Sequence, residues 1–128
     1  MGSRYDDFKA FRTRLNERIL GEGTPDKPAA TLNTKRFFTL DGNCYKAGAL
    51  DVKTKELLGL VASMVLRCDD CIAYHIDQCL KVGCTPAELF EAFDIALIVG
   101  GSIVIPHLRR GVDFMDEAVA KGIGPHSA

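Results

Sequence analysis

The chain has 128 residues, of which 47% are apolar and 26% charged, and its 16 basic and 17 acidic side chains leave a formal net charge of −1. This composition is typical of a globular protein and excludes a disordered chain. Because no basic stripe is present, nucleic acid is not expected as a partner. The length suits one domain over residues 1–128, with its core in residues 35–120 and Met1–Ser3 as a candidate cloning remnant.

The N-terminal third predicts two helices separated by a loop. Residues Tyr5–Leu20 place apolar side chains at steps of three and four, which is typical of an amphipathic helix. Residues Gly21–Thr34 hold two prolines and two glycines and predict a loop. For Lys35–Lys46 we expect a short helix. Its apolar side chains are expected to turn inward: Phe37, Phe38 and Leu40.

The middle of the chain predicts two consecutive helices. Asp51 is a predicted N-cap, and from there to about Arg67 apolar residues repeat with a helical period. The next helix is expected to begin near Cys68, because the two aspartates that follow suit the positive end of the helix dipole. Gly83 is typical of a residue that ends a helix.

The C-terminal third predicts two more helices, and no strand pattern appears, so the fold class is all-α with about six helices. Residues Thr85–Glu88 form a predicted capping box with proline at the first helical position. This helix is expected to end near Val99, with a break at Gly100-Gly101, before a last helix that has Pro106 near its start. Residues 121–128 are predicted to be a frayed tail.

The segment Ala92–Val99 is apolar around most of its circumference and must be covered on all sides. A second subunit and a central position in the core explain this equally well. The apolar run is shorter than the about 20 residues of a membrane span, and two aspartates stand where a signal peptide would become apolar. We therefore expect a cytoplasmic protein with no membrane contact, in which a C-x-x-C is more often catalytic or metal-binding than structural.

The stretch RCDDCIAYHIDQC, residues 67–79, holds three of the five cysteines and one of the three histidines. On a helix, one group of its side chains shares a side that we expect to face inward: Cys68, Cys71, His75 and Cys79. The opposite side carries Asp70, Ala73, Asp77 and Lys81. Cys71 and His75 are neighbours four residues apart, and Cys68 stands at the helix start, where free N–H groups favour a thiolate.

Three interpretations of this stretch compete: a metal site, a redox pair and a buried cysteine cluster. Cys71 and Cys79 are about 12 Å apart along a helix, so they cannot both bind one zinc ion, and a site of Cys68, Cys71 and His75 would need an outside ligand. Free cysteine also packs as a small hydrophobic residue, which we expect for Cys44, Cys79 and Cys84. The C-x-x-C pair with an imidazole one turn later favours redox chemistry.

Glu56 stands twelve positions before Cys68, on the preceding predicted helix. If the two helices pack as a hairpin, its carboxylate reaches His75, fixes the tautomer of the imidazole and raises its basicity. An ordinary solvated glutamate is the alternative. His107 is interpreted as a surface or core histidine rather than as a further member of the site.

These features together resemble the carboxymuconolactone decarboxylase superfamily, specifically its AhpD-like alkylhydroperoxidase branch. That branch combines a glutamate, a C-x-x-C-x-x-x-H motif about one helix later, a G-x-[ST]-x-x-E-[IL] helix start and a small-residue break after an apolar helix. The matching positions are Glu56, Cys68, Cys71, His75, Gly83–Leu89 and Gly100-Gly101. The resemblance covers about Phe37–Glu117.

The resemblance implies an AhpD-like helical fold, with a helical hairpin that carries the C-x-x-C motif, working as a homo-oligomer, either a trimer or a hexamer. It implies a thiol-dependent peroxidase in antioxidant defence, with Cys68 and Cys71 as the redox pair and Glu56 and His75 as the proton relay. The substrate would be a hydroperoxide, and an external dithiol such as a lipoyl group or a thioredoxin-like protein would restore the thiols. No bound cofactor is expected. Either cysteine could be the one that attacks.

Three alternative functions remain: reduction of a disulfide in a partner peroxiredoxin, lactone decarboxylation and metal binding. The decarboxylases proper lack the C-x-x-C motif, which argues against lactone decarboxylation. One departure from the peroxidase pattern concerns Asp69 and Asp70, which stand between the cysteines where some peroxidases carry a histidine. Since two acids beside the thiols disfavour a thiolate, they predict slow peroxidase turnover.

Overall fold

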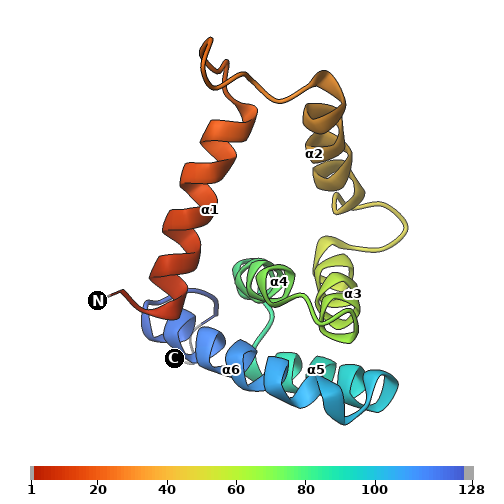
Figure 1. Ribbon diagram of the computed structural model, residues 1–128. Coiled ribbons are helices and arrows are strands. Elements are labelled where there is room, and N and C mark those ends of the chain that lie inside the picture. Colours follow the sequence, from red (N-terminus) through yellow and green to blue (C-terminus); the bar gives the residue numbers. More distant parts are fainter. Residues whose placement is uncertain (1, 126–128) are drawn as a thin grey trace.

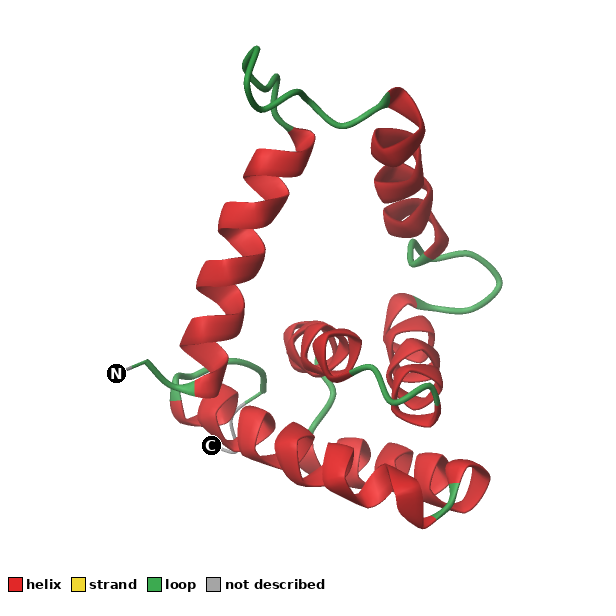
Figure 2. Cartoon of the chain, in the orientation of Figure 1, coloured by secondary structure: helices red, strands yellow, loops and turns green. Residues whose placement is uncertain are grey.

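The computed structural model describes residues 2–125, which fold into six α-helices and one short 3-10 helix (Figures 1 and 2). The helices are α1 (Arg4–Leu20), α2 (Leu32–Cys44), α3 (Val52–Val65), α4 (Asp69–Lys81), α5 (Pro86–Gly100), η1 (Ser102–Val104) and α6 (Ile105–Ala120). Within this part of the chain no strand forms beyond an isolated bridge between Gly23 and Pro28. The all-α class is confirmed. Met1 and residues 126–128 of the expected tail lie outside the described residues.

Short polar side chains define where the helices begin, as the sequence predicts. Asp51 accepts a hydrogen bond from the backbone N–H of Thr54 at 2.7 Å and so caps α3. At α5, Thr85 and Glu88 form the reciprocal capping box, with hydrogen bonds of 3.1 and 2.9 Å. Gly83 and Gly101 adopt φ values of +101° and +83°, which suit glycine, and they follow the ends of α4 and α5.

The core is formed where α4 packs between α3 and α6, while α5 lies against α3 (Figure 1). All four of these helices contribute fully buried apolar side chains, among them Leu60, Met64, Ile72, Ile76, Leu80, Leu89, Phe93, Phe114 and Met115. Burial of a side chain of this kind stabilises the fold by about 1.5–3 kcal/mol. The hairpin of α3 and α4 that the motif required is therefore the centre of the molecule.

The N-terminal helix α1 is held against α4 by one buried polar network. Asp77 of α4 is only 1% exposed, and it accepts hydrogen bonds from Tyr5 at 3.0 Å and Lys9 at 2.8 Å. Burial raises the pKa of Asp77, but the bonds from Lys9, Lys81 and Tyr5 outweigh burial and lower it below its usual value. The expectation that Asp77 faces away from the protein is wrong, because α1 covers that side of α4.

The expected inward orientation of the aromatic residues on α2 is also wrong. Phe37 is 67% exposed, Leu40 is 59% exposed and Phe38 is partly exposed, and none of the helix's residues is buried. Figure 1 shows the reason: α1 and α2 extend as two arms joined by the loop over residues 21–31, and α2 stands off the other helices. An apolar helical pattern predicts that a surface is covered, but it does not say by what.

The apolar helix α5 is buried on one side only. Leu89, Phe93 and Ala96 face the core, whereas Ile95, Ile98 and Val99 are exposed. A central core position is therefore wrong as an explanation of its composition within this chain. In the described part of the chain, no helix is both long and apolar enough to cross a membrane.

Candidate functional site

The cysteine motif lies at the turn between α3 and α4. Arg67 adopts φ +59° at the end of α3, and Cys68 donates its backbone N–H to the carbonyl of Ser63 at 3.0 Å. The N–H of Arg67 bonds to the carbonyl of Met64 at 3.0 Å, which completes a Schellman motif. This tight reversal places Cys68 at the N-cap of α4, directly after α3 ends.

Cys68 and Cys71 are joined by a disulfide bond, with their Cα atoms 5.2 Å apart. The Sγ atom of Cys68 also accepts the backbone N–H of Cys71 at 3.3 Å, which places that sulfur among the free N–H groups of the helix start. Cys68 is half-buried and Cys71 is exposed. The expected inward orientation is thus wrong for Cys71, because no helix covers the first turn of α4 on that side.

Glu56 and His75 form a buried pair behind the disulfide. Oε1 of Glu56 lies 2.8 Å from Nδ1 of His75, and the two residues are 4% and 7% exposed. The solvated alternative for Glu56 is wrong, since the hairpin of α3 and α4 brings the carboxylate under the imidazole. With Glu56 ionised, Nδ1 carries the proton and Nε2 presents a lone pair. His75 can therefore accept a proton at Nε2.

Two residues that the sequence did not identify complete the surroundings of His75. The hydroxyl of Tyr45 lies 3.3 Å from Nε2, and the two rings pack in a tilted arrangement with their centroids 5.2 Å apart. Gly59 lies beneath both groups, because a Cβ atom there would stand 2.7 Å from the Tyr45 hydroxyl and 2.7 Å from Cε1 of His75. An isolated glycine inside the α3 pattern was the available signal for this close packing. Tyr45 carried no comparable signal.

A small cavity of about 170 Å³ opens onto Cys71 and His75. Its lining comes from α1, α2 and α4: Arg12, Asp41, Asp70, Cys71, Tyr74 and His75. The Arg12 guanidinium lies 4.1 Å from the centre of the Tyr74 ring, a distance typical of a cation–π contact. Charges of both signs at the opening, together with the small volume, suit a small polar reactant better than a large apolar one.

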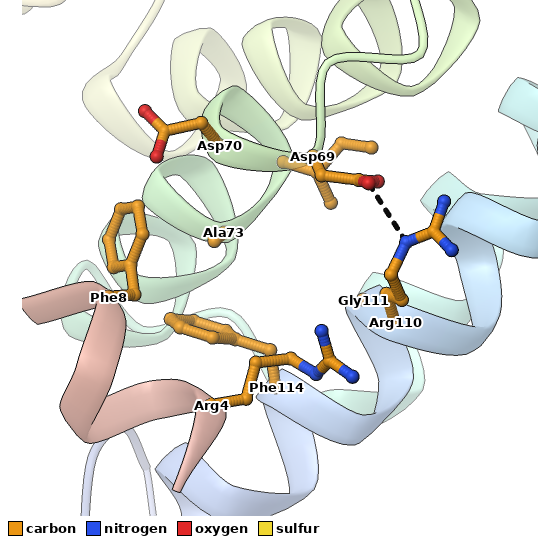
Figure 3. Close-up of a pocket in the computed structure, with 9 residues that line it drawn as sticks. Arg4, Phe8, Asp69, Asp70, Ala73, Arg110, Gly111 and Phe114 are labelled. Carbon is orange, nitrogen blue, oxygen red and sulfur yellow. Dashed lines mark hydrogen bonds and ion pairs between the residues drawn. The ribbon is translucent and has the colours of Figure 1, made fainter. Parts of the chain in front are cut away.

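Asp69, the first acid between the cysteines, is paired with two side chains of α6. Its carboxylate contacts Nδ1 of His107 at 2.7 Å and Nε of Arg110 at 2.8 Å. Figure 3 shows the Arg110 contact at the edge of a second cavity, of about 180 Å³, which Phe8 and Phe114 also line. The effect of Asp69 on the neighbouring thiols is therefore partly compensated. His107 has a defined partner within the motif.

The other three cysteines differ in their surroundings. Cys79 and Cys84 are buried as expected, and burial raises the pKa of both thiols, so they remain protonated. Cys44 is exposed at the end of α2, so the expectation that it packs in the core is wrong. In residues 2–125, no group of three or more His, Cys, Asp or Glu side chains is arranged to hold a metal ion.

The matches to known proteins agree with the fold. Residues 32–113, more than half of the chain, match the model of the carboxymuconolactone decarboxylase family. The chain belongs to the carboxymuconolactone decarboxylase family. The family identified from the motif is thus confirmed, and the AhpD-like branch is compatible with the matches.

Solved members of the carboxymuconolactone decarboxylase family share this fold. TM1620 from Thermotoga maritima is 57% identical over 92% of this chain and 97% of its own, with a TM-score of 0.83. A second crystal structure of TM1620, for which an involvement in the antioxidative response has been suggested, is 55% identical over 91% of this chain and 95% of its own, with a TM-score of 0.78. Apo-lpg0406 from Legionella pneumophila is 25% identical over 89% of this chain and 96% of its own, with a TM-score of 0.72.

Among curated proteins, the uncharacterized H16_B0147 of Cupriavidus necator is 26% identical over 112 residues, which are 86% of this chain and 94% of that protein. Its match extends over nearly the whole length of both chains.

Proposed function

We propose that this member of the family is a thiol-dependent oxidoreductase that reduces hydroperoxides with the Cys68–Cys71 pair. One observation carries the proposal: the disulfide lies at the start of α4, one turn before a buried imidazole that is hydrogen-bonded to a buried carboxylate. A redox pair needs a base at this place, and the Glu56–His75 pair supplies one. The suggested antioxidative involvement of TM1620 supports the same class of reaction.

In the first step, His75 accepts the thiol proton of Cys71 at Nε2, and Glu56 stabilises the imidazolium through Nδ1. We assign the attack to Cys71 because it is exposed and lines the same cavity as His75. The thiolate attacks the distal oxygen of the hydroperoxide, the O–O bond breaks, and the alkoxide takes the proton from His75 and leaves as an alcohol. Cys71 becomes a sulfenic acid, and the peroxide has gained two electrons.

In the second step, the thiol of Cys68 attacks the sulfenic sulfur of Cys71. The S–O bond breaks, water leaves, and the disulfide forms without any large movement, because the Cα atoms are already 5.2 Å apart. An external dithiol, such as a lipoyl group or a thioredoxin-like protein, then reduces the disulfide by exchange and is itself oxidised. The exposure of Cys71 supports its access to such a donor. A reducing compartment such as the cytoplasm would supply the donor.

The apolar surface of this chain supports assembly into a homo-oligomer, either a trimer or a hexamer. Exposed side chains of α3 and α5 line a groove of about 870 Å³, among them Leu58, Leu66 and Ile95. The uncovered arm α2 adds Phe37 and Leu40. Apolar surface of this extent marks an interaction site. Light scattering coupled to size-exclusion chromatography tests the assembly, and a monomer at all concentrations would refute it.

The exposure of Cys71 also favours a second candidate function, reduction of a disulfide in a partner peroxiredoxin. Both functions use the same dithiol, but they differ in the oxidant. In the second case, the protein would turn over with an oxidised peroxiredoxin and not with a free hydroperoxide. Lactone decarboxylation, by contrast, predicts turnover of a carboxylated lactone that survives replacement of Cys71 by serine.

The proposed function is tested by following tert-butyl hydroperoxide consumption with dithiothreitol as the reductant. Cys71→Ser and His75→Gln are expected to lose at least a hundredfold in rate, since each removes a reacting group or its base. Cys44→Ser is the matched control, because it removes an exposed cysteine that lies outside the motif. Mass spectrometry after one equivalent of peroxide should show the loss of two hydrogens in the peptide that contains both motif cysteines. If both thiols stay free, the proposed function is refuted.

A further inference from the structure

Tyr45 contacts the candidate site from a part of the chain that the motif does not include. It follows the last residue of α2 and stands 30 positions before His75, yet its hydroxyl lies 3.3 Å from Nε2 of that imidazole. The rings lie 5.2 Å apart and are tilted by 43°. The contact therefore reaches the one imidazole nitrogen that the proposed mechanism uses.

The hydrogen bond between Nδ1 of His75 and Glu56 determines which group donates in the contact with Tyr45. Glu56 occupies Nδ1 of His75 at 2.8 Å, so Nε2 of the neutral imidazole has a lone pair and the Tyr45 hydroxyl donates to it. For His75 to take up the Cys71 proton at Nε2, the hydroxyl hydrogen of Tyr45 first rotates off that lone pair, and the protonated Nε2 then becomes a donor. The phenol oxygen can then accept after a rotation of its hydroxyl hydrogen alone, with no movement of either ring.

We propose that Tyr45 is a positioning residue of the redox site, whose hydroxyl holds Nε2 of His75 in place in both protonation states of the imidazole. The effect of Tyr45 on catalysis rests on the proposed function, whereas its effect on His75 does not. The end of α2, an arm with little other packing, thereby becomes part of the site.

Contacts from α3 fix the position of Tyr45 beside His75. From α3, Nζ of Lys55 donates to the backbone carbonyls of Cys44 at 3.0 Å and Lys46 at 2.7 Å, on either side of Tyr45. Gly59 leaves the space that the hydroxyl and the imidazole share, because a Cβ atom at that position would stand 2.7 Å from each of them. Burial, followed by the charges of Asp41 and Glu56, raises the pKa of Tyr45, so the phenol keeps the proton that it donates.

Tyr45→Phe isolates this role, because it removes the hydroxyl and leaves the ring contact. We would record ¹⁵N NMR spectra of histidine-labelled protein and assign His75 with His75→Gln. The Nε2 resonance is expected to move toward that of a nitrogen whose lone pair accepts no hydrogen bond. Nδ1 should keep its proton and its hydrogen bond to Glu56. Tyr74→Phe is the matched control, since the Tyr74 ring also packs on His75, at 5.1 Å, and should leave the Nε2 resonance in place.

Two kinetic measurements accompany the spectra. Alkylation of reduced Cys71 by iodoacetamide and turnover of tert-butyl hydroperoxide should both slow by about tenfold in Tyr45→Phe, as expected for the loss of one hydrogen bond to the base. Thermal denaturation shows that the variant is folded.

The outcomes separate this inference from the proposed function. An unchanged Nε2 resonance overturns the inference, as does an unchanged alkylation rate in the folded variant. A wild-type protein that does not turn over any hydroperoxide refutes the proposed function. The spectra and the alkylation rates would still decide the role of Tyr45 in that case.

Discussion

Gly59→Ala tests whether the packing beneath His75 sets the reactivity of the site. The added Cβ would stand 2.7 Å from Cε1 of His75 and from the Tyr45 hydroxyl, whereas ordinary contact begins at 3.4 Å. The imidazole and the phenol would therefore have to withdraw by about 0.7 Å. A misplacement of about 1 Å can cost a hundredfold in rate, so we expect a loss of about ten- to a hundredfold.

The effect of Gly59→Ala on stability should be smaller than its effect on activity. Overpacking costs about 1–3 kcal/mol, whereas alanine in place of glycine inside a helix recovers about 1 kcal/mol. We therefore expect the free energy of unfolding to fall by about 0–2 kcal/mol, measured by urea denaturation.

Gly42→Ala is the matched control for this variant. It also lies inside a helix, α2, but a Cβ there would meet no atom within 4 Å. We expect it to raise the free energy of unfolding by about 0.5–1 kcal/mol and to leave hydroperoxide turnover unchanged. If Gly59→Ala retained wild-type turnover, close packing beneath the imidazole would have no part in the reaction and the reasoning would be refuted.

Three further predictions concern charged groups. Glu56→Gln should lower hydroperoxide turnover by about ten- to a hundredfold, because it removes the charge that stabilises the His75 imidazolium 2.8 Å away; wild-type turnover would contradict the relay. Arg110→Gln removes the guanidinium that pairs with Asp69, so alkylation of the reduced thiols at pH 7 should slow several-fold. An equal or faster rate would show that this pairing does not protect the thiolate. The folded state lowers the pKa of Asp77 below its usual 3.8. The stabilisation that ionised Asp77 adds to the free energy of unfolding is therefore fully present above pH 3.8 and is lost as the pH falls through the lowered pKa. Asp77→Asn should therefore reduce the free energy of unfolding by about 3 kcal/mol at pH 7 and flatten its decline below pH 4, as measured by urea denaturation; a parallel decline in both proteins would contradict this.

The candidate site was predictable to the extent that it is local in sequence. Cys68, Cys71 and His75 lie on one helix, where spacing alone determines which side chains are neighbours. Glu56 required one tertiary assumption, that α3 and α4 form a hairpin, and the tight turn at Arg67 makes that the natural outcome. Tyr45 was missed because it reaches His75 from α2, and no periodicity in the sequence relates those two segments.

The errors in burial have a common physical cause. Asp77 was expected to face solvent and the aromatic residues of α2 to face the core, and both expectations are wrong. A helical repeat shows that one side of a helix differs from the other. It does not show which other segment will cover a given side, because that depends on how the loop over residues 21–31 directs the arms α1 and α2.

The sequence by itself determined the all-α class, the caps of α3 and α5 and the proximity of Cys68, Cys71 and His75, because these depend on residues within about one or two turns of each other. It misplaced the start of α2, which lies at Leu32 with Thr31 as its cap, inside the segment expected to be a loop. Only the tertiary structure decided that Cys71 is exposed, that α1 covers Asp77, and that Asp69 is paired with His107 and Arg110. Each of these depends on contacts between segments that are distant in the chain. Their positions follow from the packing of the whole core rather than from any local pattern.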